Sequence, residues 1–231
     1  MNLLEKEMFD VLKSLRDDYG VVGVKAEFEA EGTRIDELMR LIEIVRKLNL
    51  NLGIKIGGCE AMKDLMECKQ LGTEYIIAPM VETDYALRKF IDAKNKIFNK
   101  DDRNSTEFLI NIETKTTLEN LDNIIKVCNS HESNDGISGF VFGRVDYTMS
   151  CGLPRDDINL LDNNVITDAV LQVSEKIKDH DLSLVVGGGV SLDALSIMRK
   201  IRETKLDRFE TRKVIFSQKA LEISNLDEGM L

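Results

Sequence analysis

The sequence contains no tryptophan and only two prolines in 231 residues, so proline-rich and low-complexity segments are excluded. Its four cysteines are scattered without a CxxC pair, and the only histidines are His131 and His180. Neither a zinc framework nor a disulfide scaffold is therefore predicted. Scattered thiols are typical of a protein in a reducing cytoplasm.

Long apolar runs and an excess of basic residues are also missing. No apolar stretch approaches the roughly 20 residues of a membrane span. The N-terminal stretch MNLLEKEMFDVLKSLRDDYG has acidic residues where a signal peptide needs a basic start. The formal net charge of −10 disfavours nucleic acids and anionic membranes as partners. We expect a cytoplasmic protein that binds neither nucleic acid nor membrane.

Segments with the periodicity of strands and helices alternate along the whole chain. Helical spacing begins at residues 2–18, and strands are predicted at 21–30, 52–58, 75–81, 108–113, 137–142, 182–186 and 214–217. A sustained βαβα alternation predicts a parallel sheet or barrel. We expect one domain over residues 1–231, with residues 1–20 as an N-terminal helix.

The first predicted strand has an apolar face and a charged face. Lys25, Glu27 and Glu29 alternate with apolar residues, and Lys55 occupies the same kind of position in the strand at 52–58. In a barrel the outer face packs against helices, so these charges must point inward, where they need partners or a polar site. The alternative is an edge strand with one solvated face.

Two apolar strands joined by one helix end close to carboxylates. Glu113 ends the strand at 108–113, and Asp146 follows the strand at 137–142 after Gly143 and Arg144. Parallel strands would bring both acids to one sheet edge, where α/β enzymes place their chemistry. Two carboxylates there suit a hard divalent cation, Mg²⁺ or Mn²⁺. The alternative is a pair of solvated acids.

The same segments, INIETKTTLENLDNII and GISGFVFGRVDYTMSCG, resemble the metal-binding core of the HpcH/HpaI aldolase and citrate lyase β-subunit superfamily. APMVET (Ala78–Thr83) is similar to another strand end of that family. The resemblance implies a TIM-type (β/α) barrel in which Glu113 and Asp146 hold Mg²⁺ or Mn²⁺. It further implies a homo-oligomeric carbon–carbon lyase or aldolase whose metal chelates a small α-keto acid, pyruvate- or oxaloacetate-like, or its aldol adduct.

The resemblance also suggests catalytic roles for three charged residues. Glu27 and Glu29 stand where the family has a D-x-E pair that supports the waters of the metal; both could equally pair with lysines. Lys55 stands where the family has an arginine that binds the substrate carboxylate and stabilises the enolate. A lysine keeps the charge but loses the bidentate fork.

One position departs from the family. Ala30 stands where its class II pyruvate aldolases have a catalytic histidine. The general base would then be a hydroxide on the metal, Glu29 or Glu31. His131 and His180 are predicted in connections at the opposite rim.

Candidate substrate contacts cluster around the end of the strand at 137–142. Gly143, Arg144 and Val145 offer backbone N–H groups for the substrate carboxylate, and the Arg144 side chain could hold a phosphate or second carboxylate or lie at the surface. Lys25 is a further substrate-binding candidate. GGGVS (Gly187–Ser191) opens a helix and is either a secondary phosphate site or a plain turn.

Two other functions remain open at this stage. One is a Schiff-base aldolase with Lys55, or Lys25, as the amine nucleophile. The other is a non-catalytic family member that binds a ligand or supports assembly.

The strand count is one short of the eight expected for this barrel. Relative to the family the missing strand is the first, where this chain begins with a helix. Either a short strand lies near the N-terminus, or the barrel is incomplete and closes differently.

Overall fold

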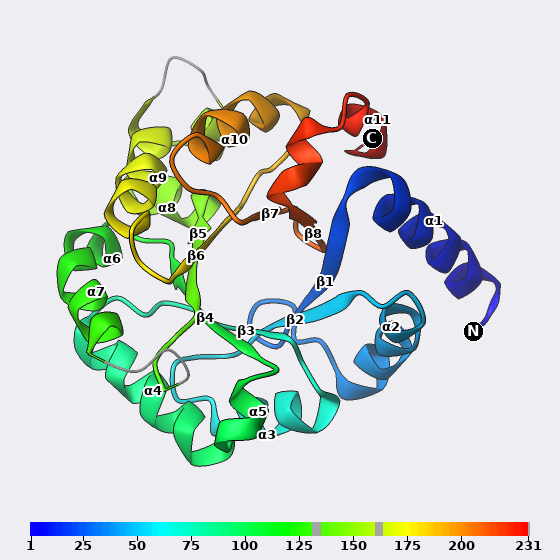
Figure 1. Ribbon diagram of the computed structural model, residues 1–231, viewed down its shortest axis with the longest axis horizontal. Coiled ribbons are helices and arrows are strands. Elements are labelled where there is room, and N and C mark those ends of the chain that lie inside the picture. The colour runs from blue at the N-terminus through cyan, green and yellow to red at the C-terminus, as the bar shows by residue number, and fades with distance from the viewer. Residues whose placement is uncertain (131–134, 160–163, 231) are drawn as a thin grey trace.

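The computed structural model describes residues 1–130, 135–159 and 164–230, which form a closed barrel with the strand order β1 to β8 (Figure 1). The strands are β1 (Val21–Glu27), β2 (Asn51–Lys55), β3 (Tyr75–Ala78), β4 (Glu107–Ile112), β5 (Gly139–Gly143), β6 (Ser183–Gly187), β7 (Arg208–Glu210) and β8 (Val214–Ser217). The barrel predicted from the family resemblance is confirmed. His131 lies outside the described residues.

Helices surround the barrel and follow the strands in sequence (Figure 1). They are α1 (Leu3–Tyr19), α2 (Ile35–Lys47), α3 (Met62–Leu71), α4 (Asp84–Ile97), α5 (Lys100–Arg103), α6 (Lys115–Glu119), α7 (Leu121–Asn129), α8 (Arg144–Ser150), α9 (Asn164–Ile177), α10 (Leu195–Arg202) and α11 (Leu226–Met230). Three short 3₁₀ helices, η1 (Arg155–Asn159), η2 (Leu192–Ala194) and η3 (Gln218–Glu222), complete the described elements. No helix in these ranges is long and apolar enough to cross a membrane.

The barrel closes in a way that the βαβα pattern does not predict. Strands β1 to β7 run parallel to their neighbours, but β8 is antiparallel to both β7 and β1. It therefore occupies the place beside β1 where a first strand would lie, and α1 packs outside the barrel against β1 and α11. Neither alternative is fully correct: no strand precedes β1 among the described residues, and the barrel closes differently but is complete, with eight strands.

The strand missed in the sequence is β7, only three residues long with one apolar member. Its outward residue Phe209 stacks on Phe216 of β8, with ring centroids 5.0 Å apart. Its inward residues are charged: Arg208 forms a bidentate pair with Glu107, and Glu210 pairs with Lys25. A hydrophobicity pattern cannot reveal so short a strand, because distant ion pairs hold its inner face.

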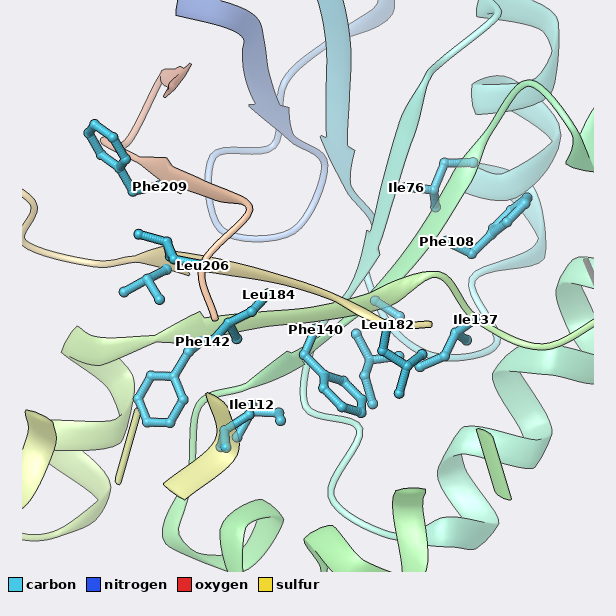
Figure 2. Packing of buried hydrophobic residues seen from close by; sticks show 14 of the residues in the cluster. Ile76, Phe108, Ile112, Ile137, Phe140, Phe142, Leu182, Leu184, Leu206 and Phe209 are labelled. Carbon is cyan, nitrogen blue, oxygen red and sulfur yellow. The ribbon is translucent and has the colours of Figure 1, made fainter. Parts of the chain in front are cut away.

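Side chains alternate between the helix-facing and the interior side of the strands, apart from an irregularity of β1 between Val21 and Gly23. Phe108, Phe140 and Phe142 belong to the large core between strands and helices (Figure 2). A small separate cluster fills the middle of the barrel: Ile77, Leu109, Val141 and Val185. These four residues separate the Arg208–Glu107 pair near the strand starts from the polar residues at the strand ends, where barrels of this type place their active sites.

Candidate active site

A cavity of about 350 Å³ opens at the carboxyl ends of the strands. Its wall is polar and comes from most of the strand ends: Lys25, Glu27, Glu29, Lys55, Asn111, Glu113, Gly143, Val145, Asp146, Gly187 and Glu210 are among the lining residues. The predicted inward direction of the charges on β1 and β2 is confirmed. Eight of the nine residues predicted for the site line this cavity, and Arg144 is the exception.

Glu113 lies at the end of β4 and is 1% exposed. Its Oε1 accepts the Met80 backbone N–H at 3.1 Å, and its Oε2 accepts Asn111 Nδ2 at 2.5 Å. The Lys55 ammonium is 3.3 Å from the same Oε2. Three donors thus hold a buried carboxylate in one orientation, which gives it a fixed place in the cavity wall.

One of those donors, the backbone N–H of Met80, is oriented by an unusual backbone conformation. The φ of Met80 is +51°, a left-handed conformation that residues other than glycine rarely adopt. The turn directs the Met80 N–H toward Glu113, while the side chain, half exposed, lines the cavity. Backbone strain at this point therefore serves the orientation of the Glu113 carboxylate.

Asp146 approaches Glu113 from the first turn of α8, which begins immediately after β5. Burial raises the pKa of the Asp146 carboxyl, and the negative charge of Glu113 raises it further, whereas Lys55 lowers it. The two acids are thus close neighbours, as the strand-end argument predicted. A cation between them would relieve the unfavourable approach of two negative charges.

Asn111 adds an unsatisfied acceptor to this wall. It is 5% exposed, and its Oδ1 has no hydrogen-bond partner among the described residues. A buried oxygen without a donor is costly, so this atom is suited to a water or ligand hydroxyl.

Lys55 connects two carboxylates across the cavity. Its ammonium is 2.9 Å from Glu29 and 3.3 Å from Glu113. Burial alone would lower the pKa of Lys55, but the charges of Glu113 and Glu29 outweigh it and raise the pKa. Lys55 is therefore a fixed cation rather than a free amine.

Lys25 forms a second buried pair, with Glu210 of β7, and its ammonium is 3.7 Å from Glu27. Glu210 is 3% exposed and is a site residue that the sequence did not reveal, because β7 was not predicted. The predicted pairing of Glu27 and Glu29 with lysines is thus present, and both acids also line the cavity.

Two glycines make room for these buried acids. A Cβ at Gly143 would lie 3.0 Å from the Glu113 Cβ and 3.1 Å from its Oε2. A Cβ at Gly187 would lie 2.9 Å from Glu210 Oε1. The absence of a side chain on β5 and β6 therefore lets carboxylates from the neighbouring strands pack against the backbone.

Gly143→Ala is expected to displace the Glu113 carboxylate by a few tenths of an ångström. We expect Mg²⁺ affinity to fall about tenfold, with a loss of about 1 kcal/mol in the free energy of unfolding. Calorimetric titration with Mg²⁺ and urea unfolding measure the two effects. Gly58→Ala is the control, because a Cβ there meets nothing within 4 Å; equal affinities for both variants would contradict this account.

Arg144 does not reach the cavity, contrary to its predicted contact with substrate. The side chain is 1% exposed; it donates to Asn159 Oδ1 at 3.1 Å and to the Gly189 carbonyl at 3.0 Å. Burial lowers its pKa to about 10. Arg144 thus ties η1 to the loop after β6, because the helix that starts at Arg144 turns its side chain away from the barrel axis.

The glycine-rich stretch after β6 does line the cavity, with Gly188 and Gly189 at positive φ. A Cβ at Gly188 would lie 2.7 Å from the Val145 backbone nitrogen. The first turn of α8 and this loop therefore pack backbone to backbone, which only glycine allows. Ser191 precedes η2 but makes no side-chain cap.

Glu31 is a poor candidate for a base. Burial alone would raise its pKa, but hydrogen bonds from Lys213 and Arg212 outweigh it and lower the pKa. Glu31 is also absent from the residues that line the cavity, whereas Glu29 and Ala30 are present. His180 lies between α9 and the start of β6, at the rim opposite the cavity.

Fold and site together define an α/β barrel with charged groups concentrated at the carboxyl ends of its strands. A family model described as HpcH/HpaI aldolase/citrate lyase matches residues 26–183. The protein therefore belongs to the HpcH/HpaI aldolase/citrate lyase family, a family of aldolases and lyases. The resemblance seen in the sequence is confirmed.

Solved structures share the fold at low identity. An HpcH/HpaI aldolase from Desulfitobacterium hafniense DCB-2 has a TM-score of 0.68 at 11% identity, over 99% of this chain and 88% of that one. A Burkholderia cenocepacia J2315 family protein has a TM-score of 0.65 at 11% identity, over 88% and 83% of the two chains. A variant of the citrate synthase SbnG has a TM-score of 0.63 at 14% identity, over 89% and 80%. No curated protein matches the sequence.

Proposed function

We propose that the protein is a divalent-metal-dependent carbon–carbon lyase or aldolase that acts on a small α-keto acid or its aldol adduct through an enolate. The observation that carries this proposal is the meeting of Glu113 and Asp146 in the cavity, with burial and mutual repulsion raising the pKa of Asp146. Nothing in a purely structural role requires two acids to face each other at a strand edge.

The donor set suits Mg²⁺ or Mn²⁺. Among the described residues no group of three or more His, Cys, Asp and Glu is arranged to hold a metal. Mg²⁺ typically binds through one or two carboxylates and keeps several waters, so the pair Glu113 and Asp146 is sufficient. The unpartnered Oδ1 of Asn111 is available to a water or ligand hydroxyl beside them. Bound there, the cation would polarise the keto group and stabilise the negative charge of the enolate.

The remaining groups of the wall have definable tasks. The Lys55 ammonium supplies fixed positive charge near the developing enolate oxygen. Glu29 is our candidate for the base that accepts a proton at its carboxylate, because it lines the cavity and is a quarter exposed, so solvent can return the proton. Gly143 and Val145 line the wall at the start of α8 and would position the substrate carboxylate through the backbone.

The Schiff-base alternative is less well supported. An amine nucleophile must be unprotonated, and the raised pKa of Lys55 keeps it as an ammonium at neutral pH. Lys25 is buried in an ion pair with Glu210. Both lysines therefore serve better as fixed charges than as nucleophiles.

Exchange of the methyl protons of pyruvate for deuterium tests the proposal without knowledge of the aldehyde partner. We expect exchange by NMR in the presence of Mg²⁺ or Mn²⁺, its loss in EDTA, and no adduct on lysine after borohydride treatment with pyruvate. Exchange that survives EDTA together with a trapped lysine would establish the Schiff-base alternative. Absence of exchange with every metal, despite thermal stabilisation by keto acids, would indicate a non-catalytic family member.

Three further expectations belong to this proposal. They are a single domain over residues 1–231, a homo-oligomeric state and a cytoplasmic location. The family resemblance supports the second, and the scattered unpaired cysteines support the third.

A further inference from the structure

Glu113, one of the two acids at the proposed metal site, lies beyond the last paired residue of its strand. The register between β3 and β4 ends at Ala78 and Ile110, and that between β4 and β5 ends at Ile112 and Phe142. The sheet therefore does not fix the backbone on the C-terminal side of Glu113. Contacts from other segments hold this part of the chain.

Glu82, in the loop between β3 and α4, supplies one of these contacts. Its Oε1 accepts the hydroxyl proton of Thr114, the residue after Glu113, with 2.5 Å between the two oxygens. The Thr114 oxygen in turn accepts the Thr117 N–H at 3.1 Å and lies 3.0 Å from the Thr117 hydroxyl. Because a hydroxyl has one proton and two lone pairs, these three contacts satisfy it completely. The Glu82 carboxylate thus fixes the orientation of Thr114 at the start of α6.

The Glu82 side chain is half-buried and has no cationic partner among the residues that the structure describes. It is also absent from the residues that line the cavity. The backbone carbonyl of Glu82 accepts Asn120 Nδ2 at 3.0 Å, which ties the same loop to the end of α6. A half-buried carboxylate without a cation is costly, but its hydrogen bond to a hydroxyl is stronger than one between neutral groups. Glu82 is therefore suited to holding the chain beside the site rather than to touching a substrate.

The loop after β3 contacts the Glu113 segment at a second point. The Met80 N–H donates to the Glu113 carboxylate at 3.1 Å, so one loop holds both the side chain of this acid and the backbone that follows it. The next residue, Lys115, donates its N–H to Ser150 Oγ at 3.0 Å, and Ser150 belongs to α8, the helix that carries Asp146. The start of α6 thus connects the loop after β3 with the helix of the second acid.

We propose that Glu82 is a positioning residue for the metal site: through Thr114 it sets how Glu113 approaches Asp146, and thereby the affinity for a divalent cation. This inference rests on the proposed function for the presence of the cation at these two acids. Groups that orient metal-binding carboxylates typically change metal affinity by about 10–100-fold when they are removed.

Titration with Mn²⁺, followed through the electron paramagnetic resonance signal of the free ion, tests this role without turnover. We expect Glu82→Ala and Thr114→Val each to weaken Mn²⁺ binding about tenfold. The double variant should bind like either single variant, because both substitutions remove the same contact. Thr114→Ser retains the hydroxyl and should restore the affinity, and Glu82→Gln, which retains an acceptor oxygen, should lose less than Glu82→Ala. A contact with a structural role alone would lower the free energy of unfolding in urea and leave the Mn²⁺ affinity of the folded protein unchanged.

Glu119→Ala is the matched control, since Glu119 is an exposed acid on α6. It removes one negative charge from the same helix and should keep the Mn²⁺ affinity of the wild type. Wild-type affinity in both Glu82→Ala and Thr114→Val, or additive losses in the double variant, would overturn the assignment. Mn²⁺ binding without pyruvate deuterium exchange would refute the lyase proposal alone and leave the affinity comparison decisive, whereas a wild-type protein that binds no Mn²⁺ would overturn both.

Discussion

Glu113→Gln and Asp146→Asn are each expected to lower Mg²⁺-dependent deuterium exchange of pyruvate by about a thousandfold or more, equivalent to about 4 kcal/mol of transition-state stabilisation. Each substitution removes one of the two carboxylates that we propose as metal ligands, and among the described residues no group of three or more His, Cys, Asp and Glu is arranged to hold a metal instead. Exchange rates by NMR and Mg²⁺ affinity by calorimetry measure the effect. Asp168→Asn, on the exposed face of α9, is the matched control and should be unchanged.

The same variants should separate metal binding from folding. Asp146→Asn removes a negative charge that faces Glu113, so the metal-free variant should be at least as stable as the metal-free wild type. The thermal stabilisation that Mg²⁺ gives to the wild type should be lost in both variants. Wild-type exchange rates in either variant would show that the chemistry lies elsewhere in the cavity.

Lys55→Met is expected to destabilise the protein by about 3–5 kcal/mol, since it leaves Glu113 and Glu29 without their shared cation. The folded-state pKa of Lys55 is raised above 10.5. The contribution of the Lys55 ammonium to the free energy of unfolding is therefore fully present below pH 10.5. It is lost as the pH rises through the folded-state pKa of Lys55. Urea unfolding between neutral and strongly alkaline pH should show the difference between wild type and variant shrinking only at the alkaline end.

Lys55→Arg distinguishes the two chemical mechanisms. An arginine keeps the positive charge between the two carboxylates but cannot form a Schiff base, so the metal mechanism predicts that measurable deuterium exchange survives. A reduction of up to about a hundredfold is compatible with altered geometry. A folded Lys55→Arg protein with no detectable exchange, alongside an active wild type, would favour the amine nucleophile.

Much of this site was predictable because strand periodicity is local. A period of two places Lys25, Glu27 and Lys55 on the face opposite their apolar neighbours, and an apolar outer face then directs them into the barrel. Glu113 and Asp146 could be paired because a helical segment was predicted between the strands that precede them. The structure has two helices there, α6 and α7, and such a crossover brings the strand ends to one edge. These inferences depend only on residues close together in sequence and on the right-handed crossover between parallel strands.

Other features depend on groups that are distant in sequence. The pair Lys25–Glu210 spans 185 residues, and the pair Arg208–Glu107 spans 101. Both hold β7, whose own three residues carry too little apolar character to indicate a strand. Arg144 lies two positions before Asp146, yet the helix that begins there buries its side chain under η1.

By itself the sequence determined the alternation of strands and helices, the inward charges of β1 and β2 and the acids at the strand ends, because each follows from a pattern along a short segment. The barrel itself was implied by the family resemblance. Only the tertiary structure decided that β8 closes the barrel in the antiparallel direction, that Glu210 joins the site and that Glu82 contacts the residue after Glu113. The physical reason is that closure and ion pairing depend on which distant groups meet in space.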